Sequence, residues 1–206
     1  MRTLSRPGTW YLFDYGMVIS TAPVQEDWDD LCRATGLDLQ PPSSPYWAGR
    51  HGFDAGDLSP EAYWSGVLGH PAAENEVELL ESLDAALWAR MNPATLDVLH
   101  SLSNEGAQLA LLSNMPAGMS RRFEAAETWP GYFYRRYFSG RLGMAKPDPR
   151  IFKHVLADLQ AAPENVVFID DNPANIQAAE ALGIRVVLHT EDTDLRQELD
   201  LLADPA

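Results

Sequence analysis

The sequence has little cysteine, few basic residues and no long apolar run. Cys32 is the only cysteine among the 206 residues, so no disulfide can form within the chain. Lysine and arginine number 15 against 30 aspartate and glutamate residues, a formal net charge of −15. Such an acidic protein is poorly suited to bind nucleic acid or an anionic membrane. No apolar run approaches the roughly 20 residues that a membrane-spanning helix needs.

These absences also bear on location. Residues 1–9 contain Arg2 and Arg6 but are not followed by the apolar segment that a signal peptide requires. A single cysteine is compatible with a reducing compartment. We therefore expect a cytoplasmic protein, either a monomer or a homodimer, that contacts neither nucleic acid nor membrane.

Groups that suit phosphate or a divalent cation stand at four places in the chain. Three of them directly follow apolar runs that read as buried parallel strands, at residues 10–13, 109–112 and 166–169. In open α/β sheets, ligands bind beyond the carboxyl ends of the strands, so these groups should converge. They are Asp14, Ser113 with Asn114, Lys146, and Asp170 with Asp171.

The alternation of elements predicts an α/β fold. From residue 92 onward, helical and strand patterns alternate, among them strands at 137–139 and 185–188 and a helix at 149–159. This alternation indicates a Rossmann-like parallel sheet with helices on both faces. Residues 23–91 contain helical patterns only, near 24–34, 61–68 and 76–91. We therefore predict a sheet domain made of residues 10–22 and 92–206, with a small helical domain, residues 23–91, inserted after the first strand.

The acidic residues favour a magnesium site. Asp14 ends the first strand, where a carboxylate can serve as nucleophile, as metal ligand or as both. Asp170 and Asp171 are adjacent and end another strand, and buried carboxylates repel unless a cation lies between them. Mg²⁺ prefers such oxygen ligands. Taken singly, each of these residues is more simply explained as a turn residue, a helix cap or a solvated charge.

The remaining polar groups suit a phosphate. A hydroxyl and backbone amides at a helix N-terminus can hold phosphate oxygens, which makes Ser113 and Asn114 candidates. Lys146 can neutralise charge between a phosphate and Asp14. The simpler interpretations are a helix cap for Ser113-Asn114 and a surface charge for Lys146.

In this order, the four segments resemble the haloacid dehalogenase-like hydrolases, most of which are magnesium-dependent phosphatases. The resemblance covers about residues 10–200 and is strongest in 142–152 (LGMAKPDPRIF) and 168–179. It implies that Asp14 is the nucleophile, Ser113 and Asn114 bind phosphate, and Lys146 bridges phosphate and nucleophile. It also implies that Asp14, Gly16, Asp170 and Asp171 hold Mg²⁺, that the substrate is a small phosphorylated molecule, and that residues 23–91 form a cap.

One part of the family pattern is missing. The family usually has a second aspartate two residues after the nucleophile, as general acid and base, and Gly16 stands there in this chain. The metal contact at that position uses a backbone carbonyl, which glycine retains, but proton transfer is lost. Such catalysis is typically worth about 10²–10⁴-fold in rate.

Two consequences of this loss stay open. The segment 13–19 is similar to a branch that resembles sugar-1-phosphate phosphatases, although that branch usually has Asn where this chain has Met17. A group of the cap can also replace the missing acid; the candidates are Asp54, His51 and Asp57 in a predicted loop.

The rival interpretation is a catalytically impaired binding or regulatory protein with the same fold. A 2-haloacid dehalogenase is disfavoured by Asp170-Asp171, and a phosphomutase by Gly16.

Aromatic residues are concentrated in the predicted cap. Most of them are expected to form the core of that small domain, because large side chains supply most of the buried area there. Tyr46 and Trp47 follow a proline-rich turn and are the better candidates for substrate contact.

Overall fold

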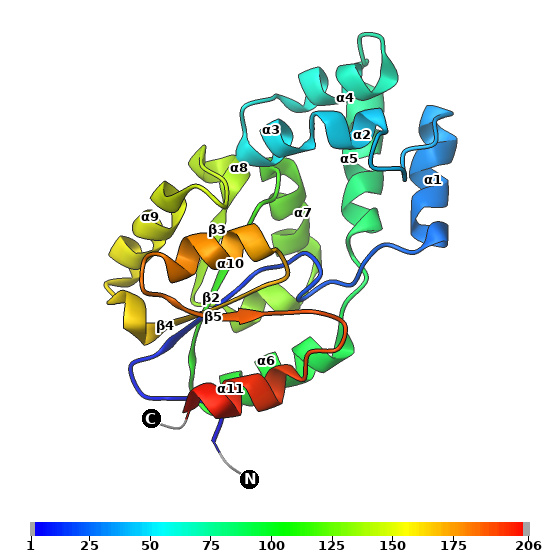
Figure 1. The fold of residues 1–206 in the computed structure, drawn as a ribbon. Coiled ribbons are helices and arrows are strands. Elements are labelled where there is room, and N and C mark those ends of the chain that lie inside the picture. Colours follow the sequence, from blue (N-terminus) through cyan, green and yellow to red (C-terminus); the bar gives the residue numbers. More distant parts are fainter. Residues whose placement is uncertain (1–2, 204–206) are drawn as a thin grey trace.

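A parallel sheet of five strands is the centre of the molecule (Figure 1). The computed structural model describes residues 3–203, so the last three residues of the predicted sheet domain lie outside the described part. The strands are β1 (Trp10–Phe13), β2 (Gln108–Ser113), β3 (Arg135–Phe138), β4 (Val166–Asp170) and β5 (Arg185–Leu188). Their order is β3-β2-β1-β4-β5. The predicted fold class is therefore confirmed.

The strand order places a ligand site at the carboxyl end of β1. The chain moves outward from β1 to β2 and β3, and then returns to the other side of β1 for β4 and β5. Crevices form where the order reverses, since the connections on the two sides leave in opposite directions. In the paired strands, Phe13 lies beside Leu111 of β2 and Ile169 of β4, so Asp14 follows directly at the centre of the sheet.

Helices cover both faces of the sheet, because apolar side chains of β1 point alternately to one face and the other. Tyr11 and Phe13 point to one face and pack with one set of helices, whereas Leu12 points to the other face. The first set is α6 (Pro93–Asn104), α7 (Ala117–Ala126), the 3₁₀ turn η1 (Trp129–Tyr132) and α11 (Leu195–Ala203). The second set is α9 (Pro149–Leu159) and α10 (Pro173–Glu180). A second 3₁₀ turn, η2 (Pro163–Asn165), precedes β4.

A second group of helices lies beyond the sheet, at the top of Figure 1, and has its own apolar core. We call it the helical unit, residues 25–87. Its helices are α1 (Gln25–Thr35), α2 (Pro45–Ala48), α3 (Arg50–Ala55), α4 (Pro60–Leu68) and α5 (Glu74–Leu87). Trp28, Tyr46, Tyr63 and Trp64 are buried within it.

The structure corrects three predicted elements. Residues 50–55, predicted as a loop, form α3, and α2 precedes it. The helix predicted to reach Met91 ends at Leu87, because Met91 forms an isolated antiparallel bridge with Ser20. The third strand, predicted at 137–139, ends at Phe138 because Ser139 begins the short helix α8 (Ser139–Leu142).

The helical unit touches the sheet unit through α3 and α8. The hydroxyl of Ser139 donates a hydrogen bond to the carbonyl oxygen of Asp54. Gly56, which ends α3 with φ +84°, lies so close to α8 that a Cβ there would be 2.9 Å from the carbonyl oxygen of Gly140. The backbone of α3 is therefore held directly against the sheet unit.

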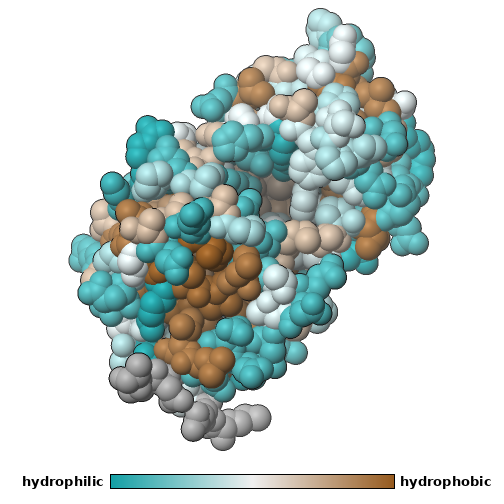
Figure 2. All heavy atoms as spheres, viewed as in Figure 1, coloured by the Kyte–Doolittle hydropathy of each residue, from teal (hydrophilic) through white to brown (hydrophobic). Residues whose placement is uncertain are grey.

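The face of the molecule drawn in Figure 2 carries an apolar area. Figure 2 shows hydrophobic side chains gathered over α10 and the edge strand β5, where Leu188 is 42% exposed. Within residues 3–203, no helix has both the length and the apolar character that crossing a bilayer requires.

We predict that the contact between α3 and α8 contributes measurably to stability. Gly56→Ala and Gly69→Ala both place a side chain at positive φ, which costs roughly 1–2 kcal/mol. Only the new methyl at Gly56 meets another part of the chain, since Gly69 has no atom within 4 Å of a Cβ. Overpacking adds about 1–3 kcal/mol, so Gly56→Ala should lower the free energy of unfolding in urea by that much more than Gly69→Ala. Equal losses would show that the approach of α3 to α8 is not tight.

Candidate active site

A buried lysine joins the ends of three strands. The Lys146 ammonium lies 2.8 Å from Oδ1 of Asp14 after β1 and 2.6 Å from Oδ2 of Asp170 in β4, and it donates to the carbonyl oxygen of Leu112 in β2 at 2.9 Å. Lys146 is 1% exposed. An ammonium has three hydrogens, and these three acceptors use all of them. The ammonium thus fixes the relative positions of the two carboxylates.

The charges of this cluster shift each other's pKa. Burial alone would lower the pKa of Lys146, but the carboxylates of Asp14 and Asp170 outweigh it and raise that pKa. Burial raises the pKa of Asp14 to about 7, although Lys146 opposes the shift. The lysine is therefore a fixed cation, while Asp14 depends on neighbouring positive charge to stay ionised.

The turn after β1 presents Asp14 to the site. The Asp14 N–H donates to the carbonyl oxygen of Ile169 at 2.8 Å, which continues the sheet pairing by one residue. Oδ1 of Asp14 accepts from the N–H of Tyr15 at 2.7 Å. Met17 has a φ of 59°, a conformation uncommon outside glycine and asparagine, so the chain reverses sharply after Gly16.

Asp170 and Asp171 complete an acidic group. Asp170 is fully buried and accepts from the Asn172 N–H at 2.8 Å and from the Asn175 amide at 3.0 and 3.1 Å. Burial and the neighbouring Asp170 raise the pKa of Asp171 to about 6. One carboxylate oxygen each from Asp14, Asp170 and Asp171 lie within 4.8 Å of one another.

This arrangement fits a divalent cation. Three carboxylates share one ammonium, which leaves an excess of negative charge at a largely buried place. Hard oxygen donors are the ligands that Mg²⁺ prefers. Burial is the main cause of the raised pKa values of Asp14 and Asp171, and the charge of Asp170 raises both further. A second cation would relieve this added repulsion.

Ser113 and Asn114 follow β2 on the other side of β1. Ser113 is 2% exposed and borders the same pocket as Asp14. The Asn114 amide donates to the carbonyl oxygen of Lys146 at 2.8 Å and its Oδ1 accepts from the Lys146 N–H at 2.9 Å. The side chain of Asn114 thus positions the lysine, and its backbone N–H is left for a phosphate.

A pocket of about 270 Å³ joins these residues to the helical unit. Asp14, Gly16, Ser113, Asn114, Lys146 and Asp171 line it from the sheet unit, and Trp47, Arg50 and Asp54 line it from the helical unit. Asp170 lies beneath the pocket rather than on its wall. The predicted residues are therefore brought together, across a gap in sequence of more than a hundred residues.

Some expectations about the helical unit were wrong or incomplete. Tyr46 is fully buried in the unit's core and does not border the pocket, whereas Trp47 does. His51 and Asp57 are exposed and lie outside the pocket lining. Sequence reasoning missed Arg50 and Trp88, which border the pocket. A buried arginine in an acidic protein gives no local pattern that would have singled it out.

Arg50 organises the wall that faces the lysine. Its Nε donates to Oδ1 of Asp54 at 2.8 Å, and its Nη1 donates to both oxygens of Asp84 at 2.9 Å. The Tyr46 hydroxyl donates to Asp84 at 2.6 Å and accepts from the Trp88 indole at 3.0 Å. Arg50 is 8% exposed, and this network holds it in the wall with its charge paired.

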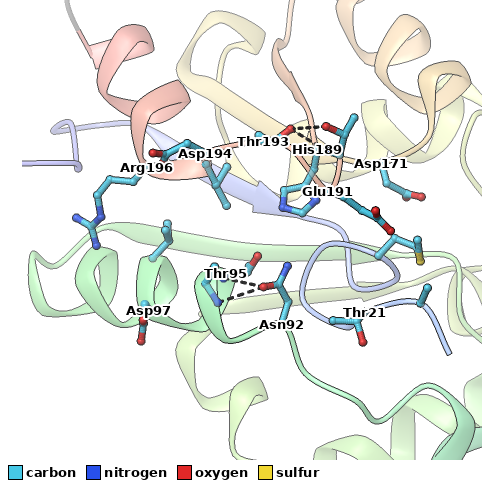
Figure 3. Close-up of a pocket in the computed structure, with 16 residues that line it drawn as sticks. Thr21, Asn92, Thr95, Asp97, Asp171, His189, Glu191, Thr193, Asp194 and Arg196 are labelled. Atoms are coloured by element: carbon cyan, nitrogen blue, oxygen red, sulfur yellow. Dashed lines mark hydrogen bonds between the residues drawn. The ribbon is translucent and has the colours of Figure 1, made fainter. Parts of the chain in front are cut away.

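A second, larger cavity of about 850 Å³ lies beside the site (Figure 3). It is bordered by the start of α6 and the loop before α11, and it shares only Met17 and Asp171 with the first pocket. His189 points into it from the end of β5, and Asn92 faces it from the start of α6. Apart from the buried Asp170, the candidate groups at the strand ends line the smaller pocket, and of them only Asp171 also borders the larger one.

The fold and this site define a class of protein that the comparisons identify. The chain belongs to the haloacid dehalogenase-like hydrolase family, whose sequence profile matches residues 42–183. A crystal structure of a HAD family enzyme from Bacteroides thetaiotaomicron has the same fold, with a TM-score of 0.75 and 21% identity over 92% of this chain and 97% of that one. Another structure of that enzyme, an aspartate-to-alanine mutant in complex with magnesium and inorganic phosphate, has a TM-score of 0.74 at 22% identity, over 92% of this chain and 98% of that one.

Two curated proteins are similar over part of their length. A drimenol cyclase of Aspergillus calidoustus is 42% identical over 82 residues, which is 39% of this chain and 15% of that protein. The phosphoserine phosphatase of Thermus thermophilus is 32% identical over 100 residues, 46% of this chain and 40% of that protein. The matched part is less than half of either relative.

We predict that replacing the buried lysine destabilises the fold. Lys146→Met leaves Asp14 and Asp170 buried without their cation, and breaking a buried ion pair costs about 3–5 kcal/mol. Lys153→Met is the matched control, because Lys153 is exposed on α9. In urea denaturation, the free energy of unfolding should be much lower for Lys146→Met than for wild type and nearly unchanged for Lys153→Met. A Lys146→Met protein as stable as the control would contradict this account of the cluster.

Proposed function

We propose that this protein is a magnesium-dependent phosphatase that hydrolyses a small phosphate monoester through a phosphorylated Asp14. The observation that carries this proposal is the position of Lys146 between Asp14 and Asp170, with Ser113 on the neighbouring strand end. A phosphate bound between Ser113 and Lys146 would lie against the Asp14 carboxylate. The phosphoserine phosphatase relative and the magnesium and phosphate complex of the structural relative support it.

In this proposal the residues of the sheet unit bind the phosphate, attack it and hold the metal. Asp14 attacks the phosphorus, Ser113 and the Asn114 backbone N–H donate to phosphate oxygens, and Lys146 balances the charge that develops on them. Asp14, Asp170, Asp171 and the carbonyl of Gly16 would hold Mg²⁺, which lowers the charge repulsion between phosphate and nucleophile when bound.

The helical unit would act as a cap over this site. We assign residues 10–22 and 92–206 to the catalytic domain and 23–91 to the cap, since the pocket has walls from both. Its volume of about 270 Å³ suits a small leaving group. Trp47 and Trp88 offer aromatic surfaces there, so sugar phosphates are the first class of substrate to assay.

Hydrolysis of a panel of phosphate monoesters, including sugar 1-phosphates, tests the proposal. Wild type should release phosphate with Mg²⁺ and not with EDTA, and Asp14→Asn should reduce turnover to background. Asp57→Asn is the control, because Asp57 is exposed outside the pocket. If wild type hydrolyses no member of the panel, the alternative of a binding or regulatory protein with an impaired site replaces the proposal.

Magnesium binding is also measurable without turnover. A ligand at a hundredfold excess over its Kd stabilises a protein by about 2.7 kcal/mol. For a chain of this size that shift raises Tm by about 5–10 °C. Asp171→Asn should lose most of the rise, and without metal its Tm should equal or exceed that of wild type, because one of the three repelling carboxylates is gone. Sodium chloride at matched ionic strength controls for screening; a rise equal to that with Mg²⁺ would argue against a specific site.

A further inference from the structure

We infer that Asp54 of the helical unit is the general acid and base of this enzyme, in place of the aspartate that Gly16 replaces. This inference rests on the phosphatase function proposed above and assigns a catalytic residue to it. It is carried by four features of the structure: an open position at Gly16, a carboxyl group in the same pocket outside the acidic group at the strand ends, the contacts that hold that carboxyl group, and its protonation.

The position at which the family carries its acid is open. Gly16 borders the pocket, and a Cβ added to it would meet no atom within 4 Å. No other side chain has filled this space, so a leaving group bound beside Asp14 is accessible from the opposite wall. That wall is formed by the helical unit.

Asp54 is the one carboxyl group in the pocket lining that lies outside the acidic group at the strand ends. The lining has three carboxylates, Asp14, Asp54 and Asp171. Asp14 and Asp171 belong to the acidic group at the strand ends, 4.8 Å or less from each other's nearest ligand oxygen. His51 and Asp57 are close to Asp54 in sequence, but both are exposed and neither borders the pocket.

Two contacts hold Asp54 in place, one with the sheet unit and one within the helical unit. Its backbone carbonyl accepts the hydrogen bond of the Ser139 hydroxyl, which also accepts from the Met115 N–H at 2.8 Å. Its side chain is 16% exposed, with Oδ1 held by Nε of Arg50. One oxygen is thus anchored, and Oδ2 has no hydrogen-bond partner among residues 3–203, so it is available to a leaving group.

The surroundings keep a proton on this carboxyl group near neutral pH. Burial raises the pKa of Asp54 to about 7; Arg50 lowers it and Asp84 raises it. The ionisable groups around Asp54 come from four helices: Arg50 on α3, Tyr46 on α2, Tyr63 on α4 and Asp84 on α5. On α8, Arg141 is paired with Glu124 at 2.6 Å, and across the pocket Lys146 is paired with Asp14. Arg50 is shared with Asp84, which is why it does not fully ionise Asp54.

The two chemical steps then balance. An oxygen of Asp14 attacks phosphorus, the bond from phosphorus to the leaving oxygen breaks, and that oxygen takes the proton of Asp54. In the second step the Asp54 carboxylate takes a proton from water, the water oxygen attacks phosphorus, and the bond from phosphorus to Asp14 breaks. Inorganic phosphate leaves, Asp14 is again a carboxylate, and Asp54 is again protonated.

Substrates that differ in their leaving group test this role. The value of kcat/KM reports the first step, in which an alkoxide needs a proton and 4-nitrophenolate does not. Asp54→Asn should lower kcat/KM for a simple alkyl phosphate by about 10²–10⁴-fold, and for 4-nitrophenyl phosphate far less. Asp57→Asn should change neither. Gly16→Asp in the Asp54→Asn background should restore alkyl phosphate hydrolysis, since the open space admits the side chain.

A wild-type measurement makes the test independent of whether Asp54→Asn folds. Only protonated Asp54 can donate a proton to the leaving group, so kcat/KM for the alkyl phosphate should fall as pH rises above about 7. The kcat/KM for 4-nitrophenyl phosphate should not fall in parallel. Equal losses for both substrates in Asp54→Asn, no loss in either, or parallel pH profiles would overturn the inference while the phosphatase function stands. A wild-type enzyme without any turnover would overturn both.

Discussion

The contact of the Lys146 ammonium with Asp14 and Asp170 is the constraint on which the rest of the site depends. It links the ends of β1, β2 and β4 through one buried cation, and each of its hydrogens has an acceptor. A charge this deep is tolerated only when it is fully paired. The Asn114 side chain makes two hydrogen bonds with the Lys146 backbone, and Asn175 donates to Asp170. These contacts therefore support the same ionic cluster. The excess negative charge that remains is what makes the place suitable for a divalent cation.

A second ionic cluster, around Arg50, faces the first across the pocket. It resembles the first in construction: one cation shared between two carboxylates, Asp54 and Asp84, in a buried place. Here too one carboxylate borders the pocket: Asp54, whose Oδ2 has no hydrogen-bond partner among residues 3–203. The attachment of α3 to α8 through Ser139 and Gly56 brings the two clusters to opposite walls of one small cavity. The Asp54 carboxyl group on this second wall makes proton transfer chemically possible without an aspartate at position 16.

Much of the fold, and of the pocket wall that the sheet unit forms, could be predicted because the sequence patterns that indicate them are local. Apolar runs such as residues 166–169 end in the polar groups that they position, and parallel strands carry such groups to the same edge of a sheet. The bounds of β1, β5 and α9 were predicted to the residue. The pocket wall that the helical unit forms could not be predicted. Helices α2 and α3 span 4 and 6 residues, too short for a helical period to show, and Asp54 meets Ser139 across 85 residues.

The sequence by itself determined which residues are candidates to bind phosphate and metal, because strand periodicity and side-chain chemistry are properties of short segments. It also exposed the loss at Gly16. Only the tertiary structure decided which carboxyl group can replace that loss. His51, Asp54 and Asp57 can each transfer a proton and lie within one short segment, so the sequence does not choose among them. The structure separates them, because only Asp54 is partly buried and borders the pocket. Those properties come from the packing of α3 against α5 and α8, which buries Arg50 beside Asp84 and turns Asp54 toward the pocket.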